Sequence, residues 1–240
     1  MLPLYIDMSS HGDGLGDHNM FQKENYFEEA CRIPFIVSWP AHTVLGSIKG
    51  TDENRLVGQA DLFGIITAAA GAEELRDGIS VMAMLAGGQD LNDDGFRAGR
   101  EYFYGTYSEP GSHQFKIMVR SHSHKYIYMA NGARELLFDL VSDTHEQSSL
   151  CALSAVATAG DAAQDDAAQL LRAMRAAGVA YLATLAAGAP ALDASSTTGF
   201  VEHAFVARPL HRIMQMAGDL GVSGFPEDPA EVLERWPARL

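Results

Sequence analysis

The spacing of apolar positions changes along the chain, and each spacing predicts a different kind of element. Near the N-terminus the short apolar run Leu4-Tyr5-Ile6 predicts the end of a buried strand. A second strand is predicted over residues 33–39, where apolar residues run together or alternate. Between them, residues 23–31 have a helical composition. This helix must end before Pro34, because the residue preceding a proline disfavours the helical conformation.

Helical spacing returns in residues 57–70, and Gly71 supplies a common C-terminal cap. Strand-like alternation follows, since Phe115, Ile117 and Val119 occupy every second position. Asn131-Gly132 is a strong signal for a hairpin turn. Four short strands in succession predict an antiparallel sheet, over residues 100–107, 113–120, 125–129 and 136–140.

Beyond residue 150 the composition shifts toward alanine, which favours helices. Asp161 is a suitable N-cap for a helix that runs toward Leu185. Gly178 weakens the middle of this helix, so two shorter helices are the alternative. A further helix is predicted around residues 208–220. The resulting domain boundaries are 1–85, a small antiparallel sheet subdomain over 86–150, and an Ala-rich helical region over 151–240.

Composition narrows the function classes. The chain has 17 basic and 31 acidic side chains and a net charge of −14, which disfavours binding to nucleic acid. Its two cysteines lie about 120 residues apart and give no disulfide framework, which favours a reducing compartment. The N-terminus lacks the pattern of a signal peptide, so we expect a cytoplasmic location. The longest uncharged stretch, residues 176–192, contains Pro190 and falls short of the ~20 apolar residues of a membrane span.

Candidate chemistry gathers in the polar loop after the first strand. The loop reads Ser9-Ser10-His11-Gly12-Asp13-Gly14-Leu15-Gly16-Asp17-His18, and Lys23 follows it. Open α/β sheets bind their ligands beyond the carboxyl ends of their strands. An imidazole, several carboxylates and a lysine at such a position suit the hydrolysis of a sulfate or phosphate ester.

This loop resembles the second metal-binding motif of the type I sulfatases, within the alkaline-phosphatase-like superfamily. In that motif an Asp-His-Gly segment is followed by a lysine, an Arg-Val/Ile-Pro segment and a strand ending in Trp-Pro. Further segments resemble the family in the same order: Val57-Gly58-Gln59-Ala60-Asp61-Leu62, Asp77-Gly78-Ile79-Ser80, Met118-Val119-Arg120, Lys125-Tyr126-Ile127-Tyr128 and Glu135-Leu136-Leu137-Phe138-Asp139-Leu140 with Asp143.

The resemblance implies an α/β fold: a partial alkaline-phosphatase-like sandwich with a small C-terminal four-stranded antiparallel sheet and packing helices. Residues 1–85 then correspond to the C-terminal part of the sulfatase-like catalytic domain. The likeness covers roughly the first 150 residues and corresponds to the C-terminal half of a sulfatase.

The same resemblance assigns roles to three residues. His11 matches a metal ligand, Lys23 matches the lysine that contacts the sulfate, and Ser10 stands where the family has an aspartate. The family's divalent metal, Ca²⁺, Mg²⁺ or Mn²⁺, is therefore expected to bind weakly or not at all, because a neutral hydroxyl replaces a carboxylate. In the alternative interpretation, His11 is an ordinary loop histidine and Lys23 a solvated lysine.

Other polar residues are interpreted as structural. Asp17 and His18 are expected to bond the loop to itself. His122 and His124 have the alternate spacing of a metal pair, but they fall in a predicted hairpin turn and are taken as surface residues.

The family's nucleophile motif, Cys/Ser-x-Pro/Ala-x-Arg, does not occur in the 240 residues, and neither Cys31 nor Cys151 fits it. The predicted function is that of a sulfatase-like hydrolase of sulfate monoesters that is incomplete without another polypeptide. A phosphonate or phosphate ester hydrolase is the alternative within the class. A catalytically inactive remnant that acts as an interaction module is the alternative outside it.

The expected partners follow from the same reasoning. A small sulfate or phosphate ester binds if another chain completes the site. Strands with unpaired edges favour a homo-oligomer or pairing with a partner half. Neither nucleic acid nor a membrane is expected as a partner.

Overall fold

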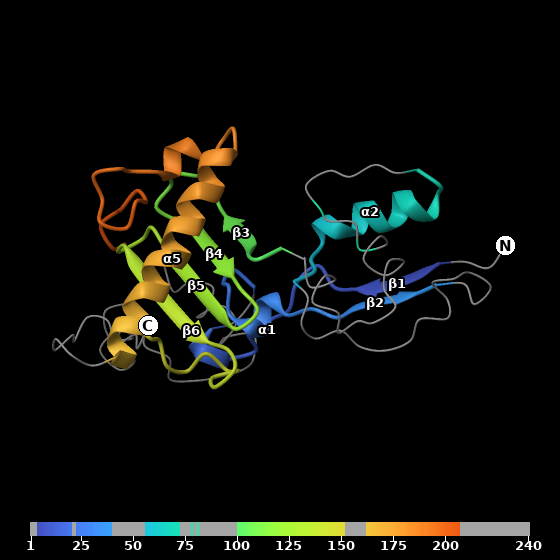
Figure 1. Ribbon diagram of the computed structural model, residues 1–240, viewed down its shortest axis with the longest axis horizontal. Helices are drawn as coiled ribbons and strands as arrows, with labels where there is room; N and C mark the ends of the chain where they lie inside the picture. The colour runs from blue at the N-terminus through green and yellow to red at the C-terminus, as the bar shows by residue number, and fades with distance from the viewer. Residues whose placement is uncertain are drawn as a thin grey trace, which may run out of the picture. The chain divides into compact units, whose positions relative to one another are not determined.

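The computed structural model describes residues 4–20, 23–39, 56–72, 78, 81, 100–151 and 162–206 (Figure 1). The chain divides into two compact units, Met1–His203 and Ala204–Leu240. All the helices and strands given below belong to the first unit. The predicted helix around residues 208–220 lies outside the described residues.

A four-stranded antiparallel sheet is the centre of the first unit. Its strands lie side by side in chain order, each paired with the next, as a meander: β3 (Phe103–Tyr107), β4 (Lys116–Arg120), β5 (His124–Met129) and β6 (Arg134–Asp139). The turn between β5 and β6 contains Asn131-Gly132, with Gly132 at a φ of 79°. The predicted sheet and its hairpin signal are therefore confirmed.

Both faces of this sheet are covered, which explains the apolar runs of its central strands. Ile117 and Val119 of β4 lie in one core cluster, and Met118 between them lies in another. This division follows from the alternation of side chains along a strand. The first cluster includes side chains of the long helix α5 (Ala162–Thr184), and the second includes Phe27 from the N-terminal segment.

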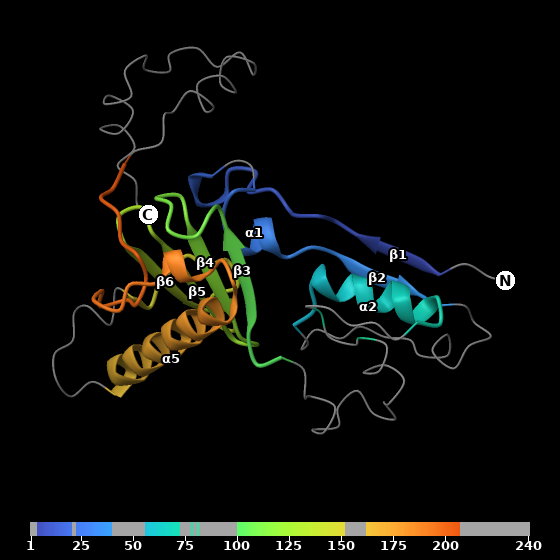
Figure 2. The same ribbon diagram turned by 90° about the horizontal axis from the view of Figure 1, so that it is seen from above.

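Helix α5 is continuous through Gly178, so the alternative of two shorter helices is wrong. Gly178 is buried where the helix approaches β4: a Cβ atom there would lie 3.1 Å from Val119 Cγ2 and 3.3 Å from Phe200 Cζ. The glycine thus allows close packing, and this packing offsets its low helix propensity. Figure 2 shows α5 against the sheet. A 3₁₀ turn, η3 (Ala189–Ala191), follows it.

The N-terminal residues form a separate strand pair. β1 (Tyr5–Met8) is antiparallel to β2 (Phe35–Ser38), and helix α2 (Ala60–Ala69) packs on one face of the pair through the fully buried Ile65. The opposite face is open, with Tyr5 65% exposed and Ile36 58% exposed. The prediction of a buried strand at Leu4-Tyr5-Ile6 is therefore wrong for this structure, because only alternate side chains are covered.

The helix predicted over residues 23–31 is reduced to one turn, α1 (Glu28–Cys31). The Asn25 side chain accepts a hydrogen bond of 3.0 Å from the backbone N–H of Phe27. Such a local side-chain bond competes with helix formation and delays the helix start. The preceding loop contains a 3₁₀ turn, η1 (Asp17–Asn19).

Helix α2 begins at Ala60, inside the predicted range of 57–70. The buried Asp61 carboxylate in its first turn accepts a hydrogen bond of 2.8 Å from the backbone N–H of Gly58. Arg100 donates to both oxygens of the same carboxylate, at 2.8 and 2.6 Å. The start of α2 is thus fixed to the segment that leads into β3.

Candidate functional site

The structure brings together His11 and Lys23, two of the residues selected from the sequence. Lys23 Nζ lies 2.6 Å from His11 Nε2. His11 Nδ1 lies 2.7 Å from the carbonyl oxygen of Gly12, which can only accept. These contacts assign the tautomer: Nδ1 carries the proton, and Nε2 accepts from the lysine ammonium. Both side chains are exposed, so the pair faces solvent.

Ser10, the third predicted residue, lies beside this pair in the chain and is also exposed. Its backbone carbonyl accepts a hydrogen bond of 2.5 Å from Gln59 Nε2, and the Ser9 carbonyl accepts a longer one of 3.4 Å from the same group. Gln59 precedes α2, so this helix start holds the backbone of the loop. The Ser10 hydroxyl carries no charge to attract a cation.

The described residues around His11 do not fit a divalent cation. The Nε2 lone pair that would bind a metal faces the Lys23 ammonium, whose positive charge repels a cation at this distance. Two groups of three potential ligands occur among the residues that the structure describes, and His11 and Ser10 belong to neither. The family's metal is therefore not assigned to the predicted position.

Contacts with α1 fix the loop that carries His11. The backbone N–H of Gly12 donates to the carbonyl of Ala30 at 2.9 Å. A Cβ on Gly12 would lie 1.8 Å from the carbonyl oxygen of Glu29, so only glycine permits this approach. Further along the loop, the Asp13 carboxylate accepts from the backbone N–H of Leu15 at 3.0 Å.

A buried ion cluster, formed by Lys125, Glu28 and Glu146, connects the start of α1 to strand β5. Lys125 is fully buried in β5, and its Nζ lies 2.5 Å from Glu28 Oε1 and 2.8 Å from Glu146 Oε1. It also donates to the carbonyl of Tyr26 at 2.9 Å. Glu146 Oε2 in turn accepts from the backbone N–H of Glu28 at 2.6 Å. The cluster thus joins the N-terminal segment, β5 and the segment after β6.

This ion cluster was missed by the sequence analysis, which used Lys125 only as part of a family-like strand. The available signal was a single cation inside an otherwise apolar strand, Lys125-Tyr126-Ile127-Tyr128. A strand buried on both faces can hold a charge only where a counter-charge meets it. The position of the two glutamates could not be read from the same pattern.

The two carboxyl groups of the cluster have opposite pKa shifts. Burial raises the pKa of Glu146 above its ordinary value, and Lys125 offsets only part of this. Burial is the largest single influence on Glu28 and acts to raise its pKa. The charge and hydrogen bond of Lys125, together with the charges of Arg120 and Arg32, outweigh burial and hold the pKa of Glu28 below its ordinary value. Glu28 is therefore the carboxylate whose ionised form the fold favours.

Neither cysteine is suited to act as a nucleophile. Burial raises the pKa of Cys31 to about 11 and that of Cys151 to about 11. The thiolate is the reactive form, and it is scarce at neutral pH when the pKa is so high. Both residues are thiols in the structure, not a disulfide.

Of the other histidine pair, His122 is an exposed turn residue as the sequence predicted, whereas His124 is half-buried in β5. His122 lies in the turn between β4 and β5, and His124 opens β5 with its Nδ1 2.8 Å from Ser123 Oγ. Neither belongs to a group of potential metal ligands among the described residues. None of the helices in the described part of the chain is long and apolar enough to cross a membrane.

Comparison with known proteins identifies what this chain resembles. Residues 16–171 match the family described as N-sulphoglucosamine sulphohydrolase, C-terminal. An arylsulfatase of Clostridium perfringens is 25% identical over 147 residues, which are 61% of this chain and 29% of that protein. A choline-sulfatase of Rhizobium meliloti is 29% identical over 153 residues, again 61% of this chain and 27% of the relative.

A solved structure shares the fold. A 2-O GAG sulfatase superposes with a TM-score of 0.58 at 23% identity, and the match covers 75% of this chain and 36% of that one. The chain spans less than a third of the length of the curated relatives it matches.

Proposed function

Because this chain belongs to the sulfatase family, through the C-terminal part of that family, we propose that it supplies the anion-binding side of a sulfate monoester hydrolase. The contact between Lys23 and His11 is the observation that carries the proposal. It places a cation at the solvent-facing edge of the loop that follows β1.

The chemistry of this pair suits a sulfate group. An ammonium group has three N–H donors, of which His11 takes one, so the others remain for the oxygens of a ligand. Charge-assisted hydrogen bonds of this kind are stronger than neutral ones. His11 fixes the direction of the lysine, and Gly12 fixes the tautomer of His11. As negative charge grows on a sulfate oxygen during ester cleavage, the positioned ammonium stabilises it.

We assign no residue of this chain as the nucleophile that attacks the ester. The sequence holds no Cys/Ser-x-Pro/Ala-x-Arg motif, and both thiols have raised pKa values. Hydrolysis therefore requires a nucleophile from a polypeptide segment outside these 240 residues. We expect no turnover of aryl sulfates by this chain alone.

Two alternative functions can be distinguished from sulfate ester hydrolysis by the experiments below. A phosphate or phosphonate ester is the alternative substrate, since an ammonium group binds these anions as well as sulfate. An inactive interaction module is favoured by the neutral Ser10 at the family's aspartate position. The two cysteine thiols are consistent with a reducing compartment, and on that basis we propose a cytoplasmic location.

The binding test uses the purified chain and its Lys23→Ala variant, titrated with an aryl sulfate and followed by NMR. Loss of one charge-assisted contact costs about 1.5–3 kcal/mol, so we expect roughly tenfold or greater weakening of sulfate binding. Arg172→Ala removes an exposed cation of α5 and serves as the matched control. Equal affinity in the chain and in Lys23→Ala would contradict the proposal.

The activity test adds the N-terminal part of a sulfatase that carries the Cys-x-Pro-x-Arg motif. Aryl sulfate hydrolysis that appears on mixing, and is lost with Lys23→Ala, supports the hydrolase. Preferred cleavage of an aryl phosphate supports the alternative substrate. Retained anion binding with no turnover on mixing supports the interaction module.

A further inference from the structure

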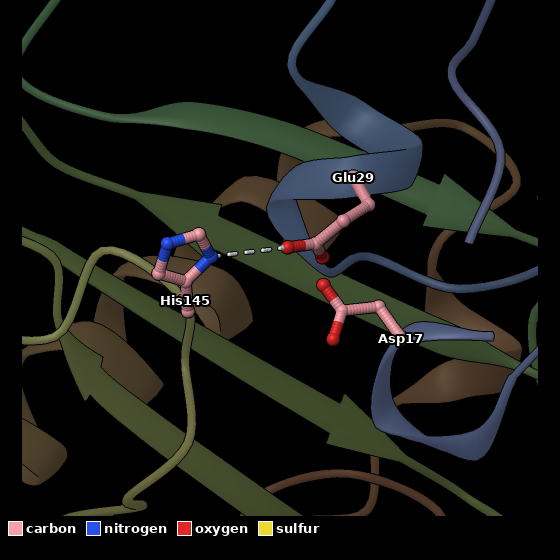
Figure 3. A group of neighbouring side chains, drawn as sticks. All are labelled: Asp17, Glu29 and His145. Atoms are coloured by element: carbon pink, nitrogen blue, oxygen red, sulfur yellow. Dashed lines mark ion pairs between the residues drawn. The ribbon is translucent and has the colours of Figure 1, made fainter. Parts of the chain in front are cut away.

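A second cluster of potential ligands lies away from His11. Asp17 and His18 belong to η1, Glu29 belongs to α1, and His145 and Glu146 lie in the segment after β6. Ligating atoms of Asp17, Glu29 and His145 all lie within 4.8 Å of one another, and so do those of His18, Glu29 and Glu146. Glu29 is common to both sets. Figure 3 shows the first set converging from three separate segments.

Three atoms of this cluster are buried without a hydrogen-bond partner: His18 Nε2, Glu29 Oε2 and Glu146 Oε1. Glu146 Oε1 lies 2.8 Å from Lys125 Nζ in an ion pair, which leaves His18 Nε2 and Glu29 Oε2 without compensation. An unsatisfied buried polar atom costs about 1–3 kcal/mol, and more for a charged group. The His18 ring is held by stacking on Phe27, with 3.9 Å between ring centroids. This imidazole therefore cannot simply turn outward to water without losing that contact.

The negative charges of Asp17 and Glu29 are also not balanced by a nearby cationic side chain among the described residues. Among the described residues, neither Asp17 nor Glu29 forms an ion pair with a lysine or arginine. His145 Nδ1 is 3.9 Å from Glu29 Oε1, too far for a hydrogen bond. Glu146 differs, because Lys125 and the Glu28 N–H already satisfy its carboxylate.

We propose that Asp17, Glu29 and His145 bind a divalent cation of the zinc class, with His18 as a further donor to the cation at Glu29. Imidazole together with carboxylate suits zinc, whereas Ca²⁺ and Mg²⁺ prefer oxygen ligands alone. Ligand atoms around a tetrahedral zinc lie roughly 3.4 Å apart, so small side-chain rotations close the site. His145 is 76% exposed, which gives the ion a path from solvent.

The bound cation joins three segments that are distant in sequence. η1, α1 and the segment after β6 then share one ion, next to the Gly12–Ala30 contact that holds the His11 loop. The site is separate from the predicted position at Ser10 and His11. The proposed cation site does not depend on the proposed hydrolase function, since none of the side chains that would bind the cation is assigned to sulfate binding.

The test is calorimetric titration of the metal-free chain with ZnCl₂ at neutral pH. We expect one ion per chain with micromolar or tighter affinity, and at least tenfold weaker binding in His145→Ala and in Glu29→Gln. His122→Ala is the matched histidine control and should bind as the unaltered chain does.

The variant His11→Ala separates this site from the position predicted by the family resemblance. Unchanged zinc affinity in this variant supports the Glu29 site. Zinc binding that is lost in His11→Ala but retained in Glu29→Gln would overturn the proposal, as would the absence of binding below about 100 μM in the unaltered chain. Because His145 is exposed, His145→Ala reports on the site even if Glu29→Gln fails to fold.

Discussion

At the scale of single residues, Lys125 shows how one buried charge organises its surroundings. Among the described residues its ammonium contacts three acceptors, the carboxylates of Glu28 and Glu146 and the carbonyl of Tyr26. Such a group adds little net stability compared with an apolar core, but removing one partner is costly. Its effect is therefore to make the position of α1 specific.

The pKa of Glu28 predicts how stability depends on pH. Its folded pKa is lowered, so its contribution is present above the unfolded value of about 4.3 and is lost as pH falls through the folded pKa. We expect Glu28→Gln to be less stable than the unaltered chain at pH 7, with the difference shrinking as the pH approaches 3.

Thermal unfolding followed by circular dichroism across this pH range measures the effect. The raised pKa of Glu146 acts in the opposite sense. Its largest cause, burial, is present in both proteins, whereas the smaller upward contribution from the Glu28 charge is absent from the variant. A difference that stays constant from pH 7 to pH 3 would show that Glu28 ionisation does not contribute.

At the scale of elements, the packing of α5 on β4 explains why Gly178 lies inside a continuous helix despite its low helix propensity. Gly178 is buried against Val119 and Phe200. The helix approaches the strand closely only because this position lacks a side chain.

We expect Gly178→Leu to lower the free energy of unfolding by about 1–3 kcal/mol, because the added atoms overpack this contact. The matched control is Ala180→Leu on the exposed side of the same helix, for which the change should stay within about 0.5 kcal/mol. Urea unfolding of both variants gives the comparison. Equal stability of the two would mean that the helix can move away from β4 at no cost.

The elements of the sheet could be predicted from the sequence because their signals are local. Alternation at Phe115, Ile117 and Val119 and the Asn131-Gly132 turn each lie within a few residues. Gly178 could not be interpreted in this way, since its role depends on a strand about sixty residues earlier. His11 and Lys23 were selected only through the family resemblance, as a metal ligand and a sulfate-contacting lysine, and their contact with each other was not predicted. The cluster at Glu29 depends on segments that no local pattern connects.

At the scale of the whole molecule, the strand pair β1–β2 leaves apolar surface uncovered. Tyr5 and Ile36 lie on the same face, because Tyr5 pairs with Ser38 and Ile36 pairs with Asp7. Both are more than half exposed. Exposed apolar faces and unpaired strand edges favour association with another chain.

We therefore predict that the chain forms a homo-oligomer, pairs with a partner half or aggregates. Light scattering should show a mass that rises with concentration, and Tyr5→Lys combined with Ile36→Lys should reduce the rise. Val141→Lys, at a residue 75% exposed in the turn after β6, serves as the control. A monomer over a wide concentration range would contradict this prediction.

The buried ion cluster also limits where the chain can be cut. A fragment that begins after residue 99 keeps the four-stranded sheet and α5, but it loses Glu28, Tyr26 and Phe27. Lys125 would then retain Glu146 as its one carboxylate from the cluster, and the apolar face around Met118 and Ile127 would lose Phe27. Limited proteolysis near residue 99 should consequently yield an N-terminal and a C-terminal fragment that stay associated, because the N-terminal fragment completes the core of the C-terminal one.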